Sequence, residues 1–150
     1  VFIDGLVNSD STPVLEAAAQ FAARRQGVLV HNIANFSTPQ FQQKTLSVEA
    51  FQDRLSEAVE DRRKRFGGNR GDLQIRDSQE VRSVRDASGQ IRLEVTPGTP
   101  SGNILFHDRN NRDLERSMAD LAETVASFRV ATDLFRTRMQ LLQSAISERV

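Results

Sequence analysis

The stretch RDLERSMADLAETVASFRVATDLFRTRMQLLQSAISERV, residues 112–150, decides the fold of this chain. Spacings of four and three residues alternate along it and mark ten positions, nine of them apolar. An average spacing of 3.5 residues stays on one side of a slightly underwound helix, which is typical of coiled-coil pairing. The pattern therefore predicts a helix over 110–150. We call the ten positions the terminal seam: Leu114, Met118, Leu121, Val125, Phe128, Thr132, Phe135, Met139, Leu142 and Ile146.

Such a helix is longer than a small globule is wide. From Asp113 to Arg149 it would span about 55 Å at about 1.5 Å per residue. A sphere made from all 150 residues would have a radius of gyration of about 15 Å. The terminal seam must therefore be covered, either by another part of the chain or by another subunit.

The partner expected within the chain is VLEAAAQFAARRQGVLVHNIAN, residues 14–35. Thr12 can cap a helix over 13–35, Pro13 suits its first position and Glu16 falls in its first turn. We expect residues 1–12 to be a flexible terminus, or a segment that orders on a partner. The two terminal helices are predicted to pair as an antiparallel coiled coil. The predicted contacts join Leu121, Val125, Phe128, Phe135 and Leu142 to Val14, Phe21, Val28 and Ile33.

The middle of the chain, residues 36–109, carries weaker patterns. Ser47 can cap a short helix over 48–65. Ile91, Leu93 and Val95 alternate with polar residues, and turn chemistry precedes them, which predicts a hairpin over about 80–95. The predicted fold class is thus mainly α with a small β-hairpin, in one domain over 1–150.

Composition argues against several classes of function. Twenty basic and twenty acidic residues cancel, so no nucleic-acid partner is predicted. The chain has no Cys, and its two His residues, His31 and His107, lie far apart in sequence. No phosphate loop, metal cluster or nucleophile motif is present, so we predict no catalytic residue, metal, cofactor or small-molecule substrate. Without a long apolar run or a basic segment before one, the chain is expected to be soluble and to lack a cleavable signal.

One segment resembles a known signature. In Ala23–Phe41, ARRQGVLVHNIANFSTPQF, an NIAN run precedes a Thr-Pro-x-aromatic run. This pattern resembles the signature of bacterial flagellar rod and hook axial proteins. Gln40 stands where that family usually has Gly, so the sequence disfavours a tight turn with positive φ there. The matching residues are Asn32, Ile33, Ala34, Asn35, Thr38, Pro39 and Phe41.

A second segment, Asp108–Thr124, is similar to the opening of the terminal helix in the proximal-rod members of that family. Arg109 and Arg112 depart from the usual Gly and Val. The residues in register are Asp108, Asn110, Asp113, Glu115 and Met118.

The resemblance implies a non-enzymatic subunit of the flagellar basal-body rod, which spans the periplasm. It implies assembly through the terminal helices into a helical tube that transmits torque and conducts exported subunits. It also implies export by the flagellar type III apparatus without a cleaved signal peptide. The implied partners are copies of the chain, other rod proteins, the adapter FliE and the export apparatus.

Alternatives stay open at this point. The chain could be another short rod protein, or a cytosolic adaptor that dimerises through a coiled coil. The motif residues Asn32–Asn35 and Thr38–Phe41 are expected at the bend after the first helix, where their side chains can bond backbone groups. They could contact a partner there or only form the turn.

Overall fold

The computed structural model describes residues 11–67, 71–86, 91–99 and 112–147. Helix α2 (Thr12–Ala34) is followed by helix α3 (Val48–Phe66). Strands β1 (Val81–Arg85) and β2 (Ile91–Val95) come next, and helix α4 (Arg112–Ser147) is the last described element. The described residues are thus mainly helical, with one two-stranded antiparallel hairpin. Asp108 and Asn110, two of the residues in register with the proximal-rod members, lie outside the described residues.

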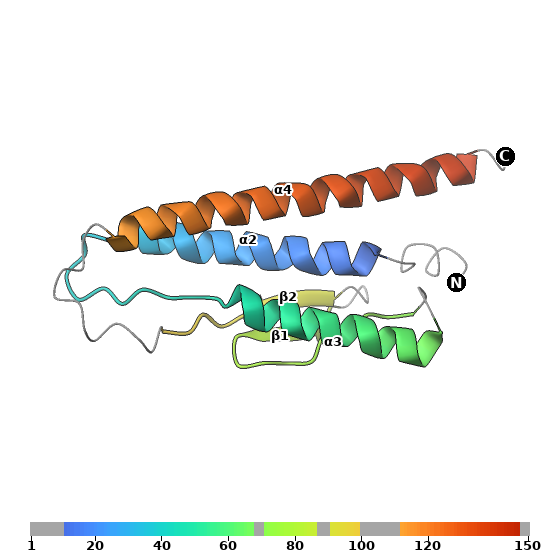
Figure 1. The fold of residues 1–150 in the computed structure, drawn as a ribbon, viewed down its shortest axis with the longest axis horizontal. Coiled ribbons are helices and arrows are strands. Elements are labelled where there is room, and N and C mark those ends of the chain that lie inside the picture. Colours follow the sequence, from blue (N-terminus) through green and yellow to red (C-terminus); the bar gives the residue numbers. More distant parts are fainter. Residues whose placement is uncertain (1–10, 68–70, 87–90, 100–111, 148–150) are drawn as a thin grey trace.

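The elements form three layers (Figure 1). Helix α2 lies in the middle, α4 packs along one side of it, and the hairpin and α3 lie on the other side. Helices α2 and α4 run in opposite directions. The two helices predicted from the ends of the chain are therefore neighbours, and α2 has to bury two sides at once.

Helix α2 begins one residue earlier than predicted. Ser11 occupies the N-cap position, and its side chain makes no capping hydrogen bond. The predicted cap, Thr12, is instead the first helical residue and is buried, while Pro13 follows it. With this start, Glu16 lies beyond the first turn. The prediction that it interacts with the helix dipole from the first turn is therefore wrong. Proline tolerates either early position because its missing N–H would have no helical partner at either.

Helix α3 confirms its predicted cap. The Ser47 side chain accepts a hydrogen bond from the Ala50 N–H at 3.1 Å. The helix ends where Gly67 takes a left-handed φ of 65° and donates its N–H to the Arg63 carbonyl at 3.0 Å. Both ends of α3 thus satisfy backbone groups that a helix terminus leaves unpaired.

The hairpin pairs Val81 with Val95 and Arg85 with Ile91. An isolated two-stranded hairpin is marginal in water, so its stability depends on packing against another element. Leu93 supplies that packing, since it is 2% exposed and faces the core. Beyond β2, the chain makes one more bridge, in which Thr45 and Gly98 exchange N–H to carbonyl hydrogen bonds of 2.8 and 3.0 Å.

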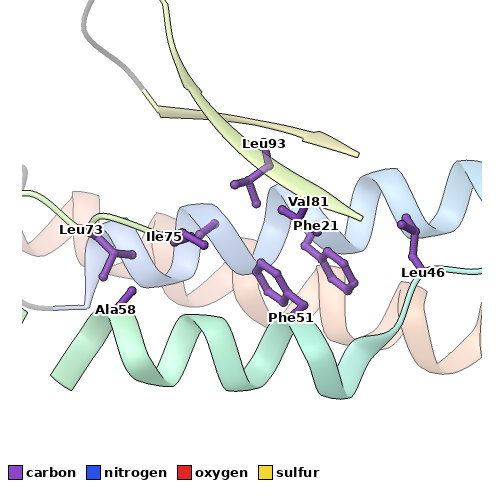
Figure 2. Packing of buried hydrophobic residues seen from close by; sticks show 9 residues of the cluster. Phe21, Leu46, Phe51, Ala58, Leu73, Ile75, Val81 and Leu93 are labelled. Atoms are coloured by element: carbon purple, nitrogen blue, oxygen red, sulfur yellow. The ribbon is translucent and has the colours of Figure 1, made fainter. Parts of the chain in front are cut away.

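One hydrophobic core holds the middle region on α2 (Figure 2). Phe21 of α2 stacks on Phe51 of α3, with ring centroids 4.0 Å apart and the planes nearly parallel. Leu73, which is 1% exposed, and Ile75 enter from the segment between α3 and β1. The full cluster is Ala17, Phe21, Leu46, Phe51, Ala58, Leu73, Ile75, Val81 and Leu93.

Candidate assembly surface

The contact between α2 and α4 is centred on small side chains of α4. Ser117, Thr124 and Ala131 are buried, and they recur every seven residues. Thr124 also accepts a hydrogen bond of 2.5 Å from Nη1 of Arg25, and its own hydroxyl bonds the Asp120 carbonyl. Small residues let two helix backbones approach closely, so this line is where the helices meet.

The terminal seam lies to one side of that line. Its members Leu121, Val125 and Phe128 are half-buried, as are Phe135 and Leu142 farther along, whereas Met118 and Ile146 are exposed. The fully buried line of α4 thus runs beside the terminal seam, and the individual contacts predicted between seam residues and the first helix stay a prediction. The apolar periodicity does mark one stripe of the helix. Full burial falls on the small residues instead, because they allow the backbones of α2 and α4 to approach most closely.

The predicted contacts on α2 also need correction. Val14, Phe21 and Val28 pack with the core cluster on the side of α3 and the hairpin. Ala22 and Leu29 are buried but stand outside that cluster. Their burial outside that cluster indicates that α4, the helix that packs along α2, covers them. Helix α2 has two apolar sides, and the sequence prediction assigned the larger residues to the wrong one.

A second apolar stripe of α4 is exposed. Val130 is 59% exposed, Leu134 53% and Leu141 59%. The spacings of four and seven residues place the three side chains on one side of the helix. We call them the outer stripe. Exposed apolar residues are ordinary when scattered singly, whereas three on one side of a helix form a candidate contact surface.

The bend after α2 contains the residues of the NIAN and Thr-Pro pattern. Nδ2 of Asn35 donates to the His31 carbonyl at 2.9 Å, and the Asn35 N–H reaches the same oxygen at 3.1 Å. The N–H of Thr38 then bonds the Asn35 carbonyl at 2.9 Å. These bonds satisfy the end of α2, and Ala34, Thr38 and Pro39 remain exposed. The role expected at the bend, side chains bonding backbone groups, is confirmed for Asn35.

The turn at Gln40 differs from the prediction. The Thr38 carbonyl accepts a hydrogen bond from the Phe41 N–H at 3.2 Å. Gln40, which lies between these two residues, has a φ of 61°. Among the described residues it is the one non-glycine residue with positive φ. Pro39 explains this turn, because proline at the second position and positive φ at the third define a type II turn. The proline therefore outweighs the absence of glycine, and Gln40 carries some backbone strain.

Asn32 is the buried member of the pattern, at 4% exposure. Its Nδ2 donates to the Lys44 carbonyl at 2.6 Å, and its Oδ1 accepts from the Lys44 N–H at 3.0 Å. The side-chain amide thus pairs with both polar groups of one backbone residue, as a neighbouring strand would. Lys44 adjoins Thr45, which bridges to Gly98, so this clamp fixes the returning segment to α2.

Gln20 forms a second amide clamp, which the sequence did not predict. Oε1 of Gln20 accepts from the Leu93 N–H at 2.9 Å, and its Nε2 donates to the Ile91 carbonyl at 3.0 Å. Gln20 therefore occupies the edge of β2 that faces away from β1. A glutamine twelve residues before Asn32 carries no sequence signal of such a role, because its partners are backbone groups more than seventy positions away.

The described parts of the two segments that resemble the rod signature, residues 23–41 and 112–124, lie toward the same end of the helix pair. Arg25 bonds Thr124, so in antiparallel helices Asn32, seven residues later, lies level with Ser117, seven residues earlier. Met118 and Glu115 are exposed there, while the side chain of Asp113 lies outside the described residues. Ile33 and Phe41 are half-buried, and the Phe41 ring meets His31 edge-on at 5.5 Å.

Metal-binding clusters and membrane-spanning helices are not found in the part of the chain that the structure describes. No group of three or more acidic, His or Cys side chains is arranged to hold a metal ion there. None of the described helices combines the length and apolar character that a membrane crossing requires. Comparison with known proteins finds no matching family model and no matching curated protein.

Proposed function

We propose that this chain is a structural subunit of the bacterial flagellar basal-body rod, of the FlgB type. It would assemble through its terminal helices, paired as a coiled coil, into a helical tube. The observation that carries the proposal is the outer stripe, because α4 uses one side for α2 and still presents Val130, Leu134 and Leu141 to solvent. A helix with two apolar sides fits a subunit that has neighbours on both.

The two resembling segments support the same proposal. They carry the motif residues Asn32 and Met118 to one end of the α2–α4 pair, although the segments lie far apart in sequence. A heterologous contact that does not close into a ring repeats into a filament or tube. Balanced charge would let such subunits crowd together without mutual repulsion.

In this proposal the chain has no catalytic role and no cofactor. Its partners are further copies, other rod proteins, the adapter FliE and the flagellar type III export apparatus. It would be exported without cleavage of a signal peptide and would act in the rod that spans the periplasm. FlgC, another short rod protein, is the nearest alternative within the same assembly.

Electron cryotomography of cells that lack the gene tests the proposal. Basal bodies with an intact inner-membrane ring but no rod, restored by the wild-type gene, are the expected result. Complete rods and normal filaments in a strain without a second copy of the gene would overturn it.

The second candidate function is a cytosolic adaptor that dimerises through α4. The outer stripe also favours it, since three apolar residues on one side suit a single partner helix. The adaptor would be a stable dimer at all practical concentrations, with termini protected from proteases. The rod subunit would be a monomer before assembly, so sedimentation and limited proteolysis of the purified chain separate the two.

A further inference from the structure

Helix α4 carries two apolar surfaces that point in different directions. The outer stripe is more than half exposed at Val130, Leu134 and Leu141. The terminal seam is half-buried at each of its members from 121 to 142, so part of every one of these side chains is accessible. Val125 of the seam and Leu134 of the stripe are nine residues apart, which is about two and a half helical turns, so they lie on opposite sides of α4. Helix α2 therefore leaves accessible apolar surface on two sides of α4.

Acidic residues border the outer stripe. Glu123 lies two turns before Val130, and Asp133 lies one turn after it. Both acids are exposed. Arg138, four residues after Leu134, is half-buried, and its Nε atom is buried. The exposed charges that border the stripe at Val130 are therefore negative.

Arginines border the terminal seam. Arg129 lies four residues after Val125, and Arg136 lies four residues after Thr132. Both arginines are exposed. Arg136 also forms an ion pair of 3.6 Å with Asp133 in the single chain, where both side chains are more than 70% exposed. Such an exposed pair contributes little to stability, so both members are available to a charged neighbour.

We propose that the outer stripe packs on the terminal seam of a second copy of the chain. Glu123 and Asp133 of one copy then face Arg129 and Arg136 of the next. Charge complementarity selects this occupant, because two outer stripes placed face to face would bring their acidic borders together. The inference rests on the proposed function and deepens it, since it names the surface of the neighbouring copy that receives the outer stripe.

The proposed contact joins two different surfaces, so it is heterologous. Each copy offers its outer stripe to one neighbour and its terminal seam to another. A heterologous contact repeats from copy to copy, whereas a contact between two identical surfaces stops at a dimer. The same helix therefore supplies both halves of a contact that extends without limit unless it closes into a ring.

Disulfide trapping in the purified chain tests the proposal. The chain contains no Cys, so introduced cysteines report the contact without background. Leu134→Cys and Val125→Cys chains are mixed, concentrated and mildly oxidised, which captures even brief encounters. Disulfides between the two variants should exceed those between two Leu134→Cys chains about tenfold, because only the mixed pair brings opposite charges together. Arg63→Cys, at an exposed position on α3, replaces Val125→Cys in the matched control.

Two further variants sharpen the test. A chain that carries both Leu134→Cys and Val125→Cys should form a ladder of covalent multimers, because the two positions are too far apart to bridge within one helix. Glu123→Arg in the Leu134→Cys chain should lower the yield of mixed disulfides about tenfold. Arg129→Glu in the Val125→Cys chain should restore it. Met118→Cys, at an exposed member of the seam, replaces Val125→Cys if that variant does not fold.

Two results would overturn the proposal. Dimers of Leu134→Cys with itself as the main product would mean that two outer stripes meet. A yield of mixed disulfides no higher than with Arg63→Cys would mean that the seam does not receive the stripe. Either failure is distinguishable from failure of the rod assignment, which depends on the rods of the deletion strain and not on this contact.

Discussion

At the scale of single residues, Asn32 connects the first helix to the middle of the chain. It is buried, and both hydrogen bonds of its amide go to the backbone of Lys44. We predict that Asn32→Ala lowers the free energy of unfolding by about 2–3 kcal/mol, because two backbone groups lose their partners. Urea denaturation measures this loss. Asn35→Ala, which removes a more exposed hydrogen bond at the same bend, should cost less than half as much.

Gln40 gives a second prediction at this scale. A left-handed conformation costs a non-glycine residue about 1–2 kcal/mol. Gln40→Gly should therefore raise the free energy of unfolding by up to about 1 kcal/mol, the remainder being offset by the greater freedom of glycine in the unfolded chain. Gln40→Val should lower it, since branching at Cβ tolerates positive φ poorly. Thermal unfolding of the two variants checks the order, and a more stable valine variant would contradict the assigned turn.

At the scale of elements, the edge of β2 depends on Gln20. Gln20→Ala should leave the Leu93 N–H and the Ile91 carbonyl without protein partners and cost about 1–2 kcal/mol. Exchange of the Leu93 amide should become at least tenfold faster. Gln26→Ala, at a half-buried position of the same helix, serves as control and should leave this amide unchanged. Unchanged protection in Gln20→Ala would mean that the clamp does not hold the hairpin.

The contact between α2 and α4 gives the second element-scale prediction. Ala131 is 7% exposed at the centre of the contact, whereas Leu134 is 53% exposed on the outer stripe. Ala131→Asp should lower the free energy of unfolding by about 3–5 kcal/mol, because it buries an unpaired charge. Leu134→Asp should cost less than about 1 kcal/mol in the isolated chain. Equal losses in urea denaturation would contradict the orientation of α4.

The sequence predicted these elements well and their contacts poorly. Capping by Ser47 and alternation around Leu93 are local signals, and both elements are present. Which side of α2 meets α4 depends on competition between two apolar sides, and periodicity alone does not rank them. The sequence predicted that Phe21 of α2 contacts α4, but its ring stacks on Phe51 of α3. A large ring fits the core better than it fits a close contact between two helices. The side-chain amides of Gln20 and Asn32 bond backbone groups of residues elsewhere in the chain. Because every residue type offers similar backbone groups, the sequence carries no pattern that identifies these partners.

At the scale of the whole molecule, the proposed function depends on α4 having one side that α2 covers and another side that is exposed. The covered side meets α2 through Ser117, Thr124 and Ala131. The uncovered side, the outer stripe, is proposed to meet neighbouring subunits in the rod. A substitution there should thus separate folding from assembly: Leu134→Asp is expected to yield a folded chain that fails to restore rods in cells lacking the gene.

The most direct test is photo-crosslinking in living cells from a photoreactive amino acid placed at Leu134. If the outer stripe meets neighbouring subunits in the rod, Leu134 should crosslink to a flagellar rod protein or to another copy of the chain in purified basal bodies. The same amino acid at Arg63, an exposed position on α3, provides the comparison for background labelling. Crosslinks confined to a cytosolic dimer, or no product above that background in cells that make rods, would contradict the rod assignment.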